Sequence, residues 1–179
     1  MDAETRSDGE RRLPALTALY EGDADRARKL LPSDDRLAVY EAAAFGRVER
    51  LRELLDEDAS RIRELSSDGF TPLHGAVFGG SAEGVALLLE RGADPNTRST
   101  GSIARVPPLG TAAFVGRANL AELLLDGGAD VDGEGEGGFT ALDAAVQNED
   151  EAMIRLLLDR GADPNLGVGI ARERLPKVG

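Results

Sequence analysis

The sequence contains a single histidine, His74, so acid–base chemistry near neutral pH through an imidazole would depend on that residue alone. No motif places a nucleophile or a carboxylate beside it, and the scattered serines and threonines have no partner base. Any catalytic site or metal cluster that needs a second imidazole is therefore excluded. The absence of cysteine excludes disulfides, thiolate metal ligands and a cysteine nucleophile. The sequence predicts no catalysis and no cofactor.

A second segment with chemical potential runs from Asp130 to Glu136, where acidic residues occupy alternate positions and Gly135 takes the sixth. This is the beginning of an EF-hand calcium loop, but such a loop needs a glutamate at its twelfth position, where the sequence has Ala141. A phosphate loop is disfavoured because no strand precedes the glycines and four carboxylates would repel the anion. We interpret residues 130–138 as an extended acidic finger and predict no metal; cation binding there stays an open alternative.

The overall charge limits the classes of partner. There are 21 basic and 33 acidic residues, a net charge of −12. Such a chain repels nucleic acid and anionic lipid, so neither nucleic acid nor membrane is predicted as a partner. No segment approaches the roughly 18 apolar residues of a membrane span, and residues 1–12 lack the apolar stretch of a secretory signal. The expected location is the cytoplasm.

The chain contains internal repeats. Three segments share a leucine triplet, two further residues and Gly-Ala-Asp, and these tripeptides begin at Gly92, Gly128 and Gly161. Residues 71–76 read Thr-Pro-Leu-His-Gly-Ala, while residues 37–55 and 14–31 are weaker copies of the same unit. One such unit cannot bury its own apolar face, so its stability comes from stacking on its neighbours.

The Thr-Pro-Leu-His-x-Ala motif and a period of about 33 residues resemble the ankyrin-repeat family. The resemblance implies an all-α solenoid of about five stacked helix pairs with connecting fingers. It also implies a protein-interaction module in which His74 is structural and hydrogen-bonds between adjacent loops. We expect a flexible tail at 1–10, an array over 11–165 and a C-terminal tail at 166–179. The expected units lie near 13–36, 37–70, 71–106, 107–139 and 140–165.

Local signals agree with helix pairs. Thr71 is a good N-cap, and Pro72 stands at the first helical position, where its missing N–H costs nothing. Glycine follows most of the expected helices, but Glu149 takes that place in the last unit. Because Ala141 also replaces the usual proline, we expect a less well-formed final unit. The finger at 97–106 is three residues longer than the period allows.

Partners of this family typically dock on the concave face, and the resemblance marks positions there as solvent-facing. At or beside them stand all five phenylalanines and one of the two tyrosines, in a sequence without tryptophan. We expect the rings to form an apolar stripe, because exposed apolar patches mark interaction surfaces. The predicted partner-binding residues are Tyr20, Phe45, Phe70, Phe78, Phe114, Val115, Phe139, Gln147 and Asn148.

Several alternatives stay open at this point. The rings could pack on their own fingers and helices, or they could mediate self-association, so the chain is expected to be a monomer or a weak homodimer. A regulatory or inhibitory protein could instead use its acidic surface to neutralise a basic partner, and its binding would then weaken with salt. An enzyme or small-ligand binder is the alternative of another class. The sequence does not identify the protein partner.

Overall fold

The computed structural model describes residues 14–101 and 105–168, which form ten α-helices in five consecutive pairs and no β-strand. The first helices of the pairs are α1 (Pro14–Tyr20), α3 (Val39–Ala44), α5 (Pro72–Gly79), α7 (Pro108–Phe114) and α9 (Ala141–Gln147). The second helices are α2 (Ala24–Leu30), α4 (Val48–Glu57), α6 (Ala82–Glu90), α8 (Ala118–Asp126) and α10 (Glu151–Asp159). The connections contain three 3₁₀ turns, η1 (Asp34–Arg36), η2 (Ala59–Arg63) and η3 (Glu136–Gly138). The prediction of an all-α array of about five helix pairs is confirmed. The predicted tail at 1–10, and the predicted C-terminal tail beyond residue 168, lie outside the described residues.

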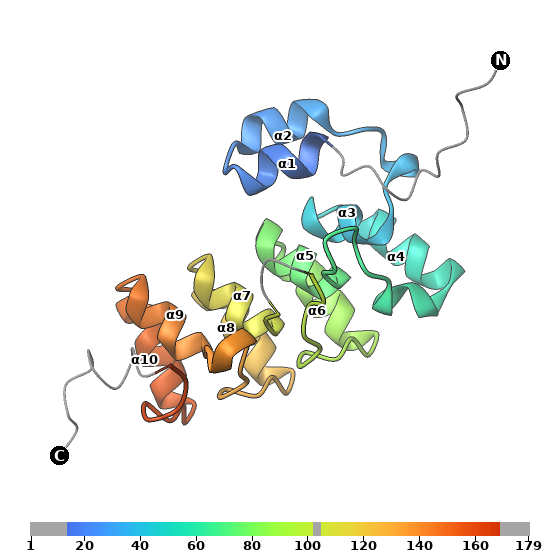
Figure 1. Ribbon diagram of the computed structural model, residues 1–179. Coiled ribbons are helices and arrows are strands. Elements are labelled where there is room, and N and C mark those ends of the chain that lie inside the picture. The colour runs from blue at the N-terminus through green and yellow to red at the C-terminus, as the bar shows by residue number, and fades with distance from the viewer. Residues whose placement is uncertain (1–13, 102–104, 169–179) are drawn as a thin grey trace.

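Four of the pairs form a double row. The first helices α3, α5, α7 and α9 pack side by side in that order, and the second helices α4, α6, α8 and α10 do the same (Figure 1). The α1–α2 pair lies beside the end of this row that contains α3 and α5 (Figure 1). The repeating pattern of the sequence therefore becomes a repeating set of helix–helix contacts.

The leucine triplets supply the core between the rows. Their middle members, Leu88, Leu124 and Leu157, are fully buried, whereas Leu158 of the last triplet is partly exposed. The buried side chains form one continuous cluster that extends from Leu37 to Ala162. Truncation of one such leucine to alanine typically costs about 2–5 kcal/mol, so the cluster is the main source of stability. None of the described helices is long and apolar enough to cross a membrane.

Two of the first helices, α5 and α9, begin with a capping box. In α5 the Thr71 hydroxyl accepts a hydrogen bond from the His74 backbone N–H, and Pro72 stands at the first helical position. In α9 the Thr140 hydroxyl accepts from the Asp143 N–H at 3.2 Å, and the Asp143 carboxylate accepts from the Thr140 N–H at 3.1 Å. The expectation of a poorly formed last unit is therefore wrong for its helices, because a capping box replaces the missing proline.

The strain in the last unit lies instead at the end of α9. Gly80 and Gly116 follow the corresponding helices α5 and α7 with left-handed φ values of 81° and 67°. At the equivalent place Glu149 has φ 56°, and it is the only residue other than glycine with positive φ in the described part of the chain. A side chain in this region of φ is strained by its Cβ atom, by about 1–2 kcal/mol.

Glu149→Gly is expected to stabilise the protein by about 0.5–1 kcal/mol. Relief of the left-handed strain is offset in part by the greater freedom of glycine in the unfolded chain. Denaturant unfolding would measure the change. Glu149→Ala is the matched control, because it removes the carboxylate and keeps the Cβ atom; equal gains from both substitutions would contradict the strain explanation.

Candidate protein-binding surface

Three phenylalanines stand near the C-terminal ends of three adjacent first helices, and we call them the aromatic row. Phe45 follows α3 directly, Phe78 lies in the last turn of α5, and Phe114 is the last residue of α7. Since α3, α5 and α7 pack side by side, the three side chains belong to one edge of the first-helix row. The equivalent position in α9 is Gln147, which is exposed.

The aromatic row is not uniformly open. Phe114 is 68% exposed, whereas Phe45 and Phe78 are half-buried. The expectation of one exposed stripe is therefore wrong for its N-terminal part. The physical reason is that α1 covers it, which a rule applied equally to every repeat unit cannot anticipate.

Tyr20, the last residue of α1, makes the covering contacts. Its ring meets that of Phe78 edge-on, with centroids 4.8 Å apart and planes at 89°. Its hydroxyl lies 2.6 Å from the hydroxyl of Tyr40, a residue that the sequence analysis left outside the stripe. Such an edge-to-face pair is worth about 0.5–1.5 kcal/mol beyond the area it buries.

The C-terminal part of the surface has a different environment. Val115 is half-buried beside Phe114, and Asn148 is exposed. The Asn148 side-chain N–H groups donate to the carbonyl oxygens of Ala113 and Phe114, at 3.3 and 2.9 Å. Asn148 thus joins the ends of α7 and α9, so this predicted contact residue has a structural use. Phe114 and Gln147 are left as the accessible side chains of this part.

The fingers carry the remaining predicted aromatic residues. Phe70 and Phe139 are half-buried, and their carbonyl oxygens accept from the N–H groups of Ser66 and Gly135 at 2.9 and 2.7 Å. In the longer finger the same bond joins Val106 to Ser99 at 3.0 Å, which places the three extra residues between these two. Phe139 packs against the main core and Phe70 against the Tyr40 cluster, so both rings also serve packing.

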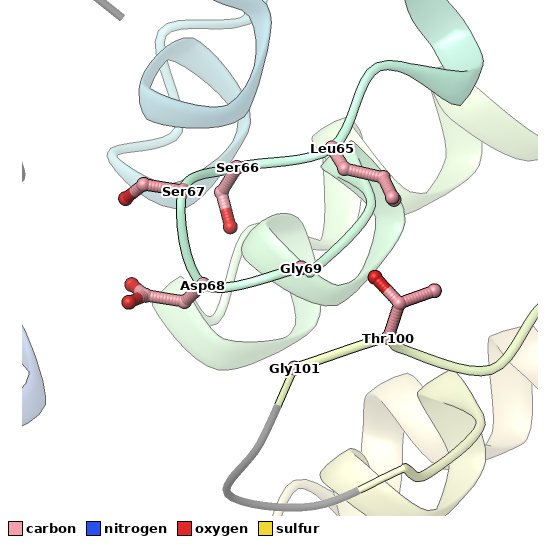
Figure 2. A pocket seen from close by; sticks show the side chains of 7 residues that line it. All are labelled: Leu65, Ser66, Ser67, Asp68, Gly69, Thr100 and Gly101. Carbon is pink, nitrogen blue, oxygen red and sulfur yellow. The ribbon is translucent and has the colours of Figure 1, made fainter. Parts of the chain in front are cut away.

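Two fingers meet closely around a pocket of about 310 Å³ (Figure 2). The Thr100 N–H donates to the carbonyl oxygen of Gly69 at 2.8 Å, and a Cβ atom on Gly69 would meet Gly101 N at 2.5 Å. Besides these three residues, the lining consists of the segment from Leu65 to Asp68. The lining carries the hydroxyls of Ser66, Ser67 and Thr100 and the carboxylate of Asp68, and it contains no histidine, lysine or cysteine.

His74 has no free ring nitrogen. Nε2 donates to the Val106 carbonyl oxygen at 2.9 Å, and Nδ1 lies 2.8 Å from the Thr71 hydroxyl. Burial lowers the pKa of His74 to about 4, because desolvation disfavours the imidazolium more than the bond to Val106 favours it. His74 is therefore neutral at pH 7 and bonds the start of α5 to the following finger, which confirms the structural interpretation of this residue.

The acidic finger uses part of its charge internally. The Asp130 carboxylate accepts from the Asp132 N–H at 3.1 Å, and that of Asp132 accepts from the Asp163 N–H at 2.9 Å. Glu134 and Glu136 are exposed. Within 14–101 and 105–168, no group of three or more acidic, histidine or cysteine side chains is arranged to hold a metal ion.

Sequence reasoning missed two leucines and one tyrosine at this surface. Leu16, Tyr40 and Ala44 form a small buried cluster, and Leu19, Tyr20, Phe45 and Phe70 pack around it. A signal for the leucines was available, because Leu16, Leu19 and Tyr20 have the spacing i, i+3, i+4 that places them on one helix face. No comparable signal identified Tyr40, which occupies the position of His74 in the next unit.

The family model described as ankyrin repeats (3 copies) matches residues 10–99 and 103–167. The chain belongs to the ankyrin-repeat family. Ankyrin repeats generally mediate protein–protein interaction, and the family is typically a non-catalytic module. The geometry agrees with this assignment in the capping boxes, the glycine turns and the finger-to-finger bond of His74.

Two of three curated relatives are similar over most of this ankyrin array, and the third over about a third of it. Transient receptor potential cation channel subfamily A member 1 of Homo sapiens is 32% identical over 160 residues, 84% of this chain and 14% of that protein. Ankyrin repeat and SOCS box protein 3 of Homo sapiens is 42% identical over 158 residues, 82% of this chain and 30% of that protein. The DNA-binding protein RFXANK of Homo sapiens is 39% identical over 62 residues, 35% of this chain and 24% of that protein. The chain thus spans less than a third of the length of each of these relatives.

Proposed function

We propose that this ankyrin array binds a protein partner on its concave face, centred on Phe114, and performs no catalysis. The single observation that carries the proposal is the 68% exposure of Phe114, at the end of a helix whose neighbours are otherwise well packed. An exposed ring in the middle of a helix row costs solubility and adds little to folding. Aromatic anchors of this kind supply much of the binding energy when a partner buries them.

The surroundings of Phe114 favour a particular chemistry in the partner. Val115 adds apolar area beside the ring, and Gln147 on the next first helix offers a neutral polar group. Glu149, two residues beyond Gln147, is exposed, and the protein carries a net charge of −12. A protein segment with an apolar centre and basic residues at its rim is complementary to this surface.

Phe114→Ser is expected to weaken partner binding by about 30-fold or more, the equivalent of at least 2 kcal/mol at an interface anchor. The free energy of unfolding should change by less than about 0.5 kcal/mol, since the ring is mostly in solvent. The partner would first be obtained by affinity capture from the source organism. Titration calorimetry with the wild type and with Phe114→Ser then measures partner affinity, and denaturant unfolding of the same two proteins measures stability.

A matched control separates the aromatic row from general surface hydrophobicity. Leu158→Ser removes a 36% exposed apolar side chain from α10, in the row of second helices, and should leave partner affinity unchanged. Equal losses from Phe114→Ser and Leu158→Ser, or a loss of about 3–5 kcal/mol in stability as for a buried ring, would contradict the proposal.

The acidic regulatory alternative has weaker support. Asp130 and Asp132 bond backbone N–H groups of the fingers, so half of the acidic finger has a structural use. Binding dominated by charge would weaken steeply with salt and would hardly respond to Phe114→Ser. The calorimetry described above, repeated at two salt concentrations, distinguishes the two candidates.

A further inference from the structure

The α1–α2 pair is attached to the array mainly through one helix face. Leu16, Leu19 and Tyr20 of α1 pack around Tyr40, Ala44 and Phe45 in a cluster that is separate from the main core. Tyr20 extends this contact to Phe78 of α5. The α1 helix therefore lies against the N-terminal part of the aromatic row.

The second helix of the pair, α2, contributes little burial to this attachment. Ala27 is the only residue of α2 that is buried; its other six residues are exposed. Both helices have seven residues, well below the roughly 12–15 at which an isolated helix becomes marginally stable in water. An element with so few buried apolar side chains opens at lower cost than the core of the array.

The aromatic row is longer than the part that α1 covers. Phe45 and Phe78 are half-buried, and the next ring along the row, Phe114, is 68% exposed. The row is therefore apolar along its length, covered at one end by a helix of this chain and open at the other. The spacing of Leu16, Leu19 and Tyr20 is that of a helix anchored in a groove, i, i+3, i+4.

We propose that α1 is an internal occupant of the aromatic row, and that a partner with an amphipathic helix carrying an aromatic side chain binds the full row by displacing α1. The partner helix would place its aromatic ring on Phe78, as Tyr20 does, and would extend over Phe114. This inference rests on the proposed function for its partner, but the opening of α1 is a property of this chain alone. While α1 covers the row the partner cannot bind the full row. The apparent affinity for the partner is therefore the intrinsic affinity multiplied by the fraction of molecules in which α1 is displaced.

The contact between α1 and the array contains two tyrosines that can report its opening spectroscopically. Tyr20 and Tyr40 are the two tyrosines of a chain that has no tryptophan, and their hydroxyls meet at 2.6 Å. Burial, with further contributions from Tyr20, raises the pKa of Tyr40 above its ordinary value. Displacement of α1 brings the Tyr40 hydroxyl into water, so the pKa of Tyr40 should fall toward its ordinary value.

The first test is hydrogen exchange on the full chain. In Tyr20→Ser the backbone N–H groups of α1 and α2 are expected to exchange about tenfold faster than in the wild type, while those of α7–α10 keep their rates. Tyr20→Phe is the matched control, because it keeps the ring on Phe78 and removes the hydroxyl; its effect should be smaller. Tyr40 should ionise at lower pH in Tyr20→Ser than in Tyr20→Phe. Exchange of α1 and α2 at the rate of the array core in the wild type would overturn the proposal, because the pair would then unfold only with the array.

The second test uses the protein captured by the wild-type array. Tyr20→Ser is expected to bind it about tenfold more tightly, because a larger fraction of molecules has the row open. Unchanged or weaker binding would overturn the displacement, even if Phe114→Ser abolishes binding as the proposed function requires. Conversely, a partner that is insensitive to Phe114→Ser refutes the proposed function, while the exchange rates of α1 and α2 still decide whether α1 opens.

Discussion

Gly79→Ala is expected to lower the free energy of unfolding by about 2–3 kcal/mol, the cost of forcing extra volume into a packed interface. A Cβ atom on Gly79 would collide with the carbonyl oxygen of Ala44, which belongs to the neighbouring helix α3. Because that atom is backbone, α3 and α5 would have to move apart to make room. Glycine at this position therefore permits the close approach of the two helices.

Gly110→Ala provides the control for this prediction. Gly110 is also a helical glycine, in α7, but an added Cβ would meet its nearest neighbour, Val106 Cβ, at an ordinary 3.5 Å. Alanine should therefore stabilise this helix by about 0.5–1 kcal/mol. Thermal or denaturant unfolding of both variants measures the difference, and a loss of the same size at both positions would contradict the explanation by close approach.

His74→Ala is expected to cost about 2–3 kcal/mol at pH 7 and to leave the partner surface intact. The substitution removes the bond from Nε2 to the Val106 carbonyl and the contact with the Thr71 hydroxyl, in a residue that is 1% exposed. Loss of a buried partner leaves the remaining polar atoms unsatisfied, at about 1–3 kcal/mol. The empty volume adds a further cost.

The same residue gives the protein a defined pH dependence. Its pKa falls from 6.5 to about 4 on folding, so between these values the unfolded chain binds a proton that the folded chain does not. The His74 contribution to stability is therefore fully present above about pH 6.5 and is lost as the pH falls toward 4, by about 3 kcal/mol in total. The stability difference between wild type and His74→Ala should narrow over this range in denaturant titrations; a constant difference would contradict the assignment of a neutral, buried imidazole.

The sequence was sufficient to predict the architecture, because each repeat unit carries its own signals. Thr71 and Pro72 start a helix, Gly80 and Gly92 end the two helices of one unit, and the middle leucine, Leu88, is buried. These signals act within one unit and its neighbours, so they can be read without knowledge of the whole chain. The exposure of Phe114 follows from the same positional reasoning.

The covering of the row by α1 could not be predicted in this way. The positional rule assigns the same exposure to Phe78 and Phe114, but Tyr20 packs on Phe78 and leaves Phe114 open. That difference arises from a contact between residues 58 positions apart, in a unit with a degenerate sequence. Asn148 differs from expectation for a related reason, since its bonds to Ala113 and Phe114 depend on how α9 sits against α7.

The central claim is that a partner docks on the first-helix row around Phe114, and chemical-shift mapping of the bound array tests it most directly. We expect the largest perturbations at residues 114, 115 and 147, with α1 shifting as it is displaced. The second helices α4, α6, α8 and α10 should be almost unaffected. Perturbations concentrated on those second helices, with the Phe114 signals unchanged, would contradict the account.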